Sequence, residues 1–221
     1  LSGGQVKIIN PAWKRIEDLV LGVLGTIVLS PLLLFISLAI VIDDGFPMFF
    51  IQKRMGQGEK PFNCVKFRTM VKNAANIGTG IYTAKDDPRI TKVGKHLRSF
   101  LDELPQIFNV IQGSMSIVGP RPSMIYQAKR YNEEQKKRLL VKPGITGWAQ
   151  VNGRNNISWP KKIELDCWYA DHVTFATDMK IIFMTFSTIA KPNTVYSDAE
   201  PDDPISRLDG VANPDALEEC K

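Results

Sequence analysis

Two adjacent carboxylates stand just before a proline in the segment Leu101-Asp102-Glu103-Leu104-Pro105-Gln106. Proline is favoured in the first turn of a helix, so Asp102 and Glu103 are expected immediately before a helix N-terminus. The helix dipole and the free amides at that position keep carboxylates ionised. An ionised carboxylate can attack phosphorus or hold Mg²⁺. A charged helix start without catalytic function explains an isolated pair more simply, so this hypothesis needs support from the rest of the chain.

Two arginines near this pair have the geometry for binding phosphate. Arg98 stands four residues before Asp102, so a single helix would place both on one face, where Arg98 can pair with the carboxylate or steady a phosphate. Arg121 lies between Pro120 and Pro122, which restrict its backbone, and its planar guanidinium suits phosphate oxygens. A rigid turn that carries a solvated arginine is the alternative for Arg121.

Further cations lie on an expected strand and after an expected turn. Lys66 and Arg68 alternate with apolar residues, which places both on one face of a strand, although a solvated face shows the same pattern. Arg154 follows the Asn152-Gly153 pair, which favours a tight hairpin turn. From that turn, Arg154 can either reach an anion or simply lie on the surface of a hairpin.

The sequence lacks the motifs of several common enzyme classes. The segment Gly56-Gln-Gly58-Glu-Lys60 has neither the spacing nor the terminal Ser or Thr of a Walker loop, and no Gly-x-Gly-x-x-Gly follows a strand. Two histidines, His96 and His172, give little basis for a zinc site or a catalytic triad. The carboxylate pair and its neighbouring cations remain the outstanding chemical feature.

The charge of the chain is unevenly distributed. The formal net charge is +5, but Asp198–Lys221 holds eight acids against two bases, which leaves +11 for residues 1–197. Gln52–Arg98 contains eleven Lys and Arg against three acids. Such a basic body suits a polyanionic partner, whether nucleic acid, anionic lipid or a nucleotide diphosphate. The three cysteines are far apart, which favours a reducing compartment.

An uncharged run of 24 residues, Leu19–Ile42, is long enough to span a bilayer, because a straight helix of that length rises about 36 Å. Pro31 removes the amide that would bond the Ile27 carbonyl and bends the helix, and the Ser30 hydroxyl can satisfy freed backbone groups. Two structures satisfy this pattern: a helix-break-helix at Ser30 and Pro31 that enters and leaves on one side, and a spanning helix that tolerates a proline.

Positive charge flanks this run on both sides. Lys14 and Arg15 precede it, and the cations that follow it are Lys53, Arg54, Lys60 and Lys66. The positive-inside rule therefore points both ends toward the cytoplasm, as a helix-break-helix requires.

The remaining elements are short, and together they predict an α/β fold in which helices dominate. Apolar residues recur at helical spacing from Gly94 until Pro105 interrupts them. The other expected elements are strands over Met48–Lys53 and Phe62–Met70, a helix over Ser123–Leu140, a helix capped by Ser158 that runs to about Tyr169, and a core or membrane-surface helix over Ile181–Ile189.

Taken in order, these pieces resemble the bacterial sugar transferase family, in its PglC-like group of monotopic phosphoglycosyl transferases. The resemblance runs from about Lys14 to Tyr196 and leaves the acidic tail outside. The matching segments are Lys14-Arg15 with the Ser30-Pro31 break, Lys66-Phe-Arg-Thr-Met70, Asp87-Pro-Arg-Ile90, Leu101–Gln106, Gly119–Pro122, Lys142-Pro-Gly-Ile-Thr-Gly147 and Val151-Asn-Gly-Arg-Asn155.

The resemblance implies a monotopic protein on the cytoplasmic face of a bacterial inner membrane. Its expected parts are an N-terminal segment over residues 1–12, a re-entrant helix hairpin over residues 13–45 bent at Ser30 and Pro31, a compact cytoplasmic transferase domain over residues 46–197 with amphipathic surface helices, and an acidic flexible tail over residues 198–221.

The resemblance also implies the chemistry. Asp102 attacks the β-phosphate of a UDP-sugar, giving an aspartyl phosphosugar and UMP, and a polyprenyl phosphate of the undecaprenyl type then displaces the aspartate. Glu103 assists the second step or helps Asp102 to hold Mg²⁺, which offsets the diphosphate charge. The residues expected to bind substrate are Lys66, Arg68, Arg98, Pro120, Arg121, Pro122, Asn152 and Arg154.

The expected partners are the UDP-sugar donor, the polyprenyl phosphate acceptor, membrane lipids and downstream glycosyltransferases, with no nucleic acid. The product would begin the assembly of a glycoprotein, O-antigen, capsule or exopolysaccharide. Two alternatives of other classes stay open: a membrane-anchored protein that binds anionic lipid or nucleic acid, and a membrane-bound nucleotide-sugar hydrolase.

Overall fold

The computed structural model describes residues 8–74, 87–98, 100–153 and 156–189, and within them helices dominate a small amount of sheet, as expected. The helices are α1 (Ala12–Asp44), α2 (Lys92–Leu97), α3 (Gln106–Gln112), α4 (Ile125–Ala128), α5 (Trp148–Val151), α6 (Trp159–Asp171) and α7 (Phe175–Ile189). Short 3₁₀ helices are η1 (Gln57–Glu59), η3 (Leu101–Glu103) and η4 (Gln135–Leu139).

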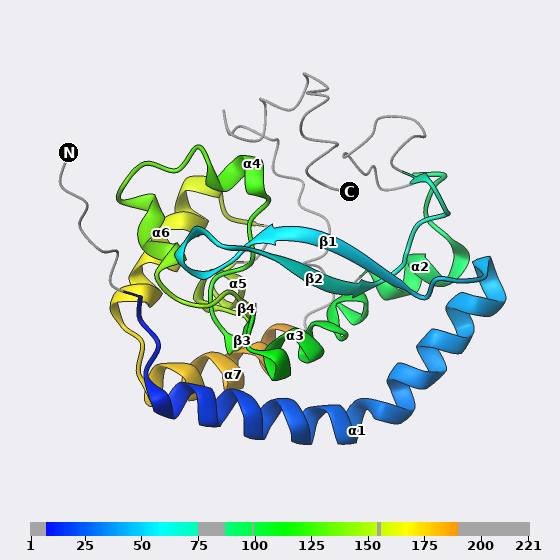
Figure 1. Ribbon diagram of the computed structural model, residues 1–221, viewed down its shortest axis with the longest axis horizontal. Helices are drawn as coiled ribbons and strands as arrows, with labels where there is room; N and C mark the ends of the chain where they lie inside the picture. The colour runs from blue at the N-terminus through cyan, green and yellow to red at the C-terminus, as the bar shows by residue number, and fades with distance from the viewer. Residues whose placement is uncertain (1–7, 75–86, 99, 154–155, 190–221) are drawn as a thin grey trace.

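Two small sheets lie within this helical framework (Figure 1). Strands β1 (Phe49–Met55) and β2 (Pro61–Phe67) form an antiparallel ribbon whose register runs from Phe49 opposite Phe67 to Met55 opposite Pro61. Strands β3 (Ser116–Val118) and β4 (Gly144–Thr146) pair in parallel. The two strands expected from the sequence are therefore confirmed, with β2 ending earlier than expected.

Helix α1 is continuous through its proline. The Ser30 hydroxyl donates to the Ile27 carbonyl at 2.8 Å and so replaces the amide that Pro31 lacks. Because that carbonyl has a partner, the expected break becomes a change of direction within a single helix of 33 residues. Figure 1 shows α1 curving beneath the rest of the molecule, with both ends turned toward the same side.

The concave side of α1 packs on the rest of the protein along its whole length. Near its middle, Gly22 and Gly25 allow a close approach to α3, and a Cβ on Gly25 would lie only 2.8 Å from the Ile107 Cδ1 atom. Further along, a core cluster joins its residues Leu33, Ile36 and Ile40 to Phe67 of β2 and Leu97 of α2. The helix is thus part of the core as well as the most apolar segment of the chain.

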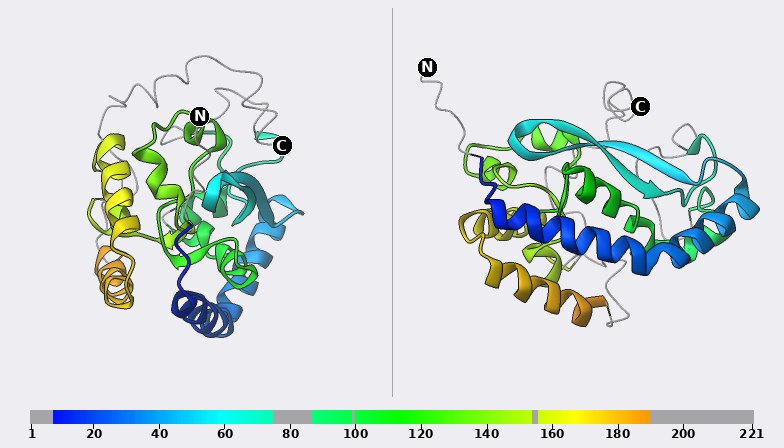
Figure 2. Two further views of the ribbon diagram at one scale, coloured as in Figure 1. Left: turned by 60° about the vertical axis from the view of Figure 1, so that its left-hand side comes forward. Right: turned by 60° about the horizontal axis from the view of Figure 1, so that its bottom comes forward.

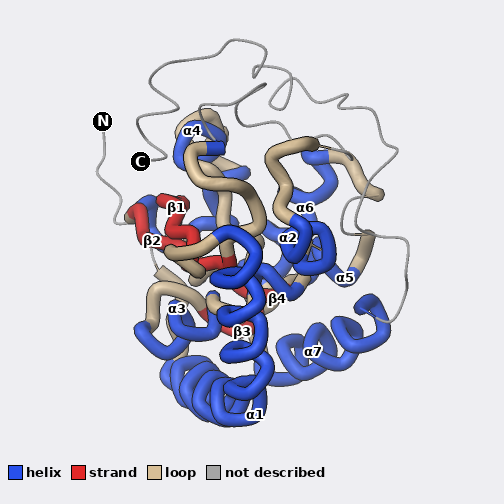
Figure 3. The backbone as a smooth tube through the Cα atoms, turned by 90° about the vertical axis from the view of Figure 1, so that its right-hand side faces the viewer, coloured by secondary structure: helices blue, strands red, loops and turns tan. Residues whose placement is uncertain are grey.

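The opposite face of α1 is apolar and exposed. Helix α7 lies on the same side of the molecule as α1, away from the β1–β2 ribbon (Figures 2 and 3). Exposed large apolar side chains on these two helices are Ile16, Leu19, Val20, Val23, Leu24, Ile27, Val28, Leu32, Leu34, Phe35, Leu38, Ile42, Phe175, Phe183 and Phe186. Within the described residues, α1 is the one helix long and apolar enough to cross a membrane.

The cations that precede the apolar run are engaged with the body of the protein. Lys14 is buried and forms an ion pair with the fully buried Asp178 of α7. Arg15 donates to the carbonyls of Val110 and Ile111 at 2.7 Å each and so caps the C-terminal end of α3. These two cations fix the start of α1 to the body, which their sequence position alone did not indicate.

Two expectations on the second half of the chain need correction. The helix expected over residues 123–140 is only α4 and η4, because the Asn132 side chain accepts from the Gln135 amide and starts a separate turn. The described residues at Asn152-Gly153 do not form the expected hairpin turn, since Asn152 follows the last turn of α5 and its side-chain amide donates to the Trp148 carbonyl. The helix expected after Ser158 is confirmed as α6, which runs to Asp171, but the Ser158 side chain at its N-cap position makes no capping hydrogen bond.

Candidate active site

The carboxylate pair lies in the 3₁₀ turn η3, directly before α3. Pro105 has a φ of −62° and occupies the cap position of α3, which begins at Gln106. Asp102 and Glu103 therefore precede a helix N-terminus, as the proline predicted.

The expectation that Arg98 and Asp102 share one helical face is wrong. Helix α2 ends at Leu97, and Phe100 has an extended φ of −177° with a ψ of −14°, so the chain changes direction before η3 begins. The positive charge of Arg98 still acts on the Asp102 carboxyl, but as the weakest of the charges around it.

Glu103 is held by two cations from distant segments. The Arg121 guanidinium donates to both Glu103 oxygens, with Nη1 at 2.9 Å from Oε2 and Nη2 at 2.5 Å from Oε1. Lys66 Nζ from β2 donates to Oε1 at 2.8 Å. Burial would raise the pKa of Glu103, but the charges of Arg121 and Lys66 outweigh that effect and hold the pKa well below its usual range. Glu103 is therefore a fixed negative charge.

Asp102, its neighbour, is available for reaction. Among the residues that the structure describes, none forms a hydrogen bond or ion pair with its carboxylate, although Lys66 and Arg121 lie close enough to influence it. Burial raises the pKa of the Asp102 carboxyl, and the positive charge of Lys66 is the largest influence that lowers it. A partly buried carboxylate without a partner, next to two cations, can act as a nucleophile toward an electrophile that carries negative charge.

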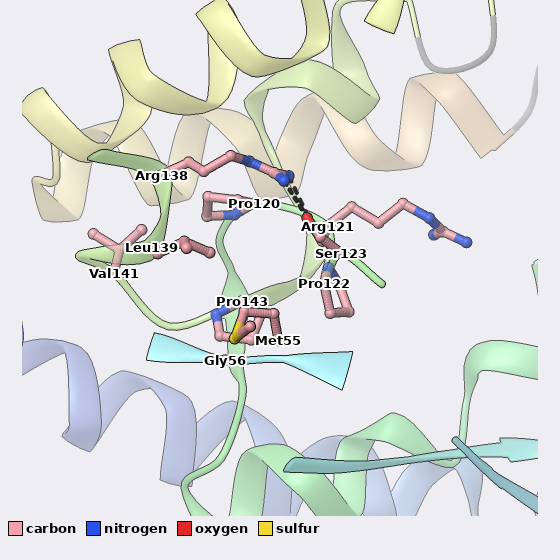
Figure 4. A pocket seen from close by; sticks show the side chains of 10 residues that line it. All are labelled: Met55, Gly56, Pro120, Arg121, Pro122, Ser123, Arg138, Leu139, Val141 and Pro143. Carbon is pink, nitrogen blue, oxygen red and sulfur yellow. Dashed lines mark hydrogen bonds between the residues drawn. The ribbon is translucent and has the colours of Figure 1, made fainter. Parts of the chain in front are cut away.

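Arg121 projects from a loop that neighbouring elements hold in place. Arg54 of β1 donates to the Pro122 carbonyl at 3.2 Å, and Arg138 of η4 donates to the Arg121 carbonyl at 3.0 Å. The hollow that Pro120 and Pro122 line behind this loop measures about 10 Å³, which is room for roughly one water molecule. Figure 4 shows the Arg121 side chain pointing away from that hollow, so a large substrate would meet the guanidinium on its other side.

The other expected substrate-binding residues lie elsewhere or outside the described chain. Arg68 follows β2 and binds the C-terminal end of α1, donating to the Gly45 carbonyl at 2.6 Å and pairing with Asp44 at 3.0 Å. Asn152 caps α5 with its side chain, and Arg154 lies outside the described residues. The structure thus brings together Lys66, Asp102, Glu103 and Arg121, and it does not bring Arg68 to them.

Two residues around this cluster were missed by sequence reasoning. Arg138 stands in the run Gln135-Lys-Lys-Arg138, where nothing distinguishes a buried arginine from a solvated lysine. Arg54 was counted only as a charge that follows the apolar run. Both donate to backbone carbonyls of residues more than fifteen positions away, so no local pattern could identify them.

The residues present suit a metal ion that is held mainly by its substrate. Within the described part of the chain, no three His, Cys, Asp or Glu side chains gather at one place. Mg²⁺ is commonly bound through one or two carboxylates together with phosphate oxygens and water. The unpartnered Asp102 meets that requirement better than Glu103, whose oxygens already accept hydrogen bonds from two cations.

The chain is similar to known proteins over most of its length. A family model described as bacterial sugar transferase matches residues 9–192. The uncharacterized sugar transferase EpsL of Bacillus subtilis is 44% identical over 173 residues, which are 78% of this chain and 84% of the relative.

Two longer relatives have names that state an activity. The UDP-glucose:undecaprenyl-phosphate glucose-1-phosphate transferase of Escherichia coli is 41% identical over 80% of this chain and 40% of its own length. The undecaprenyl-phosphate galactose phosphotransferase of Salmonella typhimurium is 35% identical over 83% of this chain and 41% of its own length. The chain therefore corresponds to less than half of each of these two proteins.

Replacing Lys66 by Met should raise the pKa of Asp102 further, because the Lys66 charge is the strongest of those that lower it. The titration can be followed by ¹³C NMR of protein labelled at the aspartate carboxyl carbon, with Asp102→Asn identifying the signal. Lys60→Met removes an exposed cation outside the cluster and should leave the titration unchanged. An equal shift in both variants, or none in Lys66→Met, would show that Lys66 does not act on Asp102.

Proposed function

This chain belongs to the bacterial sugar transferase family, and we propose that it transfers a sugar phosphate from a UDP-sugar to a polyprenyl phosphate of the undecaprenyl type. It is thus a phosphoglycosyl transferase. The observation that carries this proposal is the unpartnered Asp102 carboxylate beside Lys66 and Arg121, two cations that Glu103 holds in place. The names of the E. coli and Salmonella relatives support the choice of acceptor, and the former also that of donor.

The first step joins the sugar phosphate to the protein. An oxygen of Asp102 attacks the β-phosphorus of the UDP-sugar, and the bond between that phosphorus and the bridging oxygen breaks. The bridging oxygen leaves on the α-phosphate as part of UMP, so no proton has to be transferred. The product on the protein is an aspartyl phosphosugar.

The second step restores the carboxylate. An oxygen of the polyprenyl phosphate attacks the same phosphorus and the bond to Asp102 breaks, which gives a polyprenyl diphosphate sugar. Dividing the transfer in this way lets one site serve a water-soluble donor and a lipid acceptor in turn.

The cations beside Asp102 supply the electrostatic part of the reaction. Negative charge on the phosphoryl oxygens would repel a carboxylate, and Lys66 and Arg121 reduce that repulsion at the point of attack. Glu103 keeps both cations in position before substrate arrives, so little reorganisation is needed. Arg98 adds a weaker positive charge, the smallest of those that lower the pKa of Asp102. When bound, Mg²⁺ would be held by the diphosphate oxygens together with the Asp102 carboxylate, and it would offset the diphosphate charge.

The contacts of α1 support a helix that enters and leaves the membrane on one side. Its first turns reach Asp178 of α7 through Lys14, and near its last turn Asp43 accepts from the Val93 amide of α2 at 2.9 Å. A helix that crosses a hydrocarbon core of about 30 Å has its ends on opposite sides, where a single polar body cannot contact both. In the proposed topology, the apolar outer face of the curved α1 lies in the membrane and both of its ends lie in the cytoplasm.

In this proposal the transferase lies on the cytoplasmic face of the bacterial inner membrane. There the donor arrives from water and the acceptor arrives within the lipid, and the product remains in the membrane for glycosyltransferases that extend it. The enzyme would accordingly begin the assembly of a polysaccharide or another glycoconjugate.

Replacing Asp102 by Asn should lower lipid-dependent UMP release by at least roughly 10³-fold, because the nucleophile is lost. The assay measures UMP from a panel of UDP-sugars with Mg²⁺, with and without polyprenyl phosphate. Thermal unfolding should be unchanged, since the Asp102 carboxylate has no partner in the described structure, and Glu133→Gln provides a control at an exposed carboxylate. UMP release at full rate without any lipid would instead indicate a hydrolase, and turnover by Asp102→Asn would exclude this residue as nucleophile.

Cysteines introduced at Asn10 and at Lys53, which are exposed before and after α1, should both react with an impermeant maleimide from the cytoplasmic side. Cys167 and Cys220 are replaced by Ser in this background, and Cys64 stays because it is fully buried. Labelling is compared between intact spheroplasts and inverted membrane vesicles. Reaction of one position only in spheroplasts and the other only in inverted vesicles would show that α1 crosses the membrane.

A further inference from the structure

Arg138 of η4 is a buried cation that the proposed reaction does not use directly. Its side chain is 3% exposed and forms an ion pair with Asp166 of α6, with Nη2 at 2.6 Å from Oδ2. The same guanidinium donates to the Tyr131 hydroxyl at 2.5 Å, to the Ser123 hydroxyl, and to the Arg121 carbonyl at 3.0 Å. One side chain thus connects α6 and η4 to the loop that carries Arg121.

The burial of this pair is costly enough to require a reason. Removing two charges from water costs several kcal/mol per ion, and apolar residues of similar volume often stabilise a protein as well or better. The contacts of Arg138 include a backbone carbonyl, which apolar residues could not bind. A planar guanidinium with several donors can hold Asp166 and a backbone carbonyl at the same time, in fixed directions.

The contacted carbonyl belongs to the residue whose side chain faces Glu103. In Figure 4, Arg138 approaches the loop from one side and the Arg121 side chain extends away on the other. Fixing the main chain at Arg121 restricts where its guanidinium can go. That guanidinium is half exposed and ends on Glu103, so little besides Glu103 and the loop itself determines its position.

We propose that Arg138 is a positioning residue for the transferase reaction: it holds the main chain at Arg121 so that the Arg121 guanidinium meets Glu103 and the donor phosphates. The inference rests on the proposed function, because it assigns Arg138 a role in that reaction through Arg121. Arg138 itself does not touch the reacting groups. Asp166 supports it by neutralising its charge and orienting its guanidinium.

Replacing Arg138 by Lys keeps the charge beside Asp166 but loses the planar set of donors. We expect Arg138→Lys to lower kcat/KM by about tenfold or more, and thermal unfolding is measured in parallel to show that the variant is folded at the assay temperature. Tyr131→Phe is the matched control, because it removes another partner of Arg138 and leaves the bond to the Arg121 carbonyl intact. Its kcat/KM should stay within about twofold of the wild type.

The decisive comparison is made in an Arg121→Met background. If Arg138 acts through Arg121, adding Arg138→Lys to Arg121→Met causes no further loss of kcat/KM. If the two losses multiply, or if Arg138→Lys alone turns over like the wild type, the proposal is overturned. Should Arg138→Lys fail to fold, the apolar pair Arg138→Met with Asp166→Leu is used in both backgrounds and read in the same way.

Turnover by the wild-type protein distinguishes a failure of this inference from a failure of the proposed function. If the wild-type protein releases UMP in a lipid-dependent way and the losses of kcat/KM multiply in the double variant, the role of Arg138 is contradicted and the proposed function is not. Absence of lipid-dependent UMP release by the wild type contradicts the proposed function, and with it the inference.

Discussion

The interaction on which the site depends is the clamp of Lys66 and Arg121 on Glu103. It joins three segments that are far apart in the sequence: strand β2, the turn η3 and the loop before Ser123. Both cations would repel each other without the carboxylate between them, and the carboxylate would be costly to bury without the cations. Asp102 therefore lies beside two cations, and its carboxylate has no hydrogen-bond or ion-pair partner among the described residues. This arrangement is in place before any substrate binds.

The apolar helix α1 is connected to this site through packing. Gly25 allows α1 to lie against Ile107 of α3, and α3 begins directly after the carboxylate pair. Leu101 and Leu104, on either side of the pair, pack on the core cluster that includes Leu33 and Ile36 of α1. The segment proposed to lie in the membrane therefore supports the turn that presents Asp102. In the proposed reaction, the lipid acceptor and the soluble donor would meet at this turn, on the boundary between membrane and water.

Sequence reasoning succeeded where the physical cause is local. A proline two positions after Glu103 predicted the turn before a helix, and the missing amide of Pro31 predicted the role of the Ser30 hydroxyl. It failed where the cause is long-range. The pairing of Glu103 with Arg121 across eighteen residues, and the engagement of Arg68 with the end of α1, depend on how the chain folds back. The family resemblance predicted that Lys66 and Arg121 bind substrate, but neither it nor spacing indicated that Glu103 would hold both.

The central claim is that Asp102 becomes covalently joined to a phosphorylated sugar. The most direct measurement is intact mass spectrometry of the protein mixed with Mg²⁺ and a UDP-sugar that supports turnover, without acceptor, followed by proteolysis to locate the modification. The account requires a mass gain equal to the sugar phosphate on the peptide that contains Asp102, and its disappearance when polyprenyl phosphate is added. Formation of product with no such adduct, or an adduct on another residue, would contradict it.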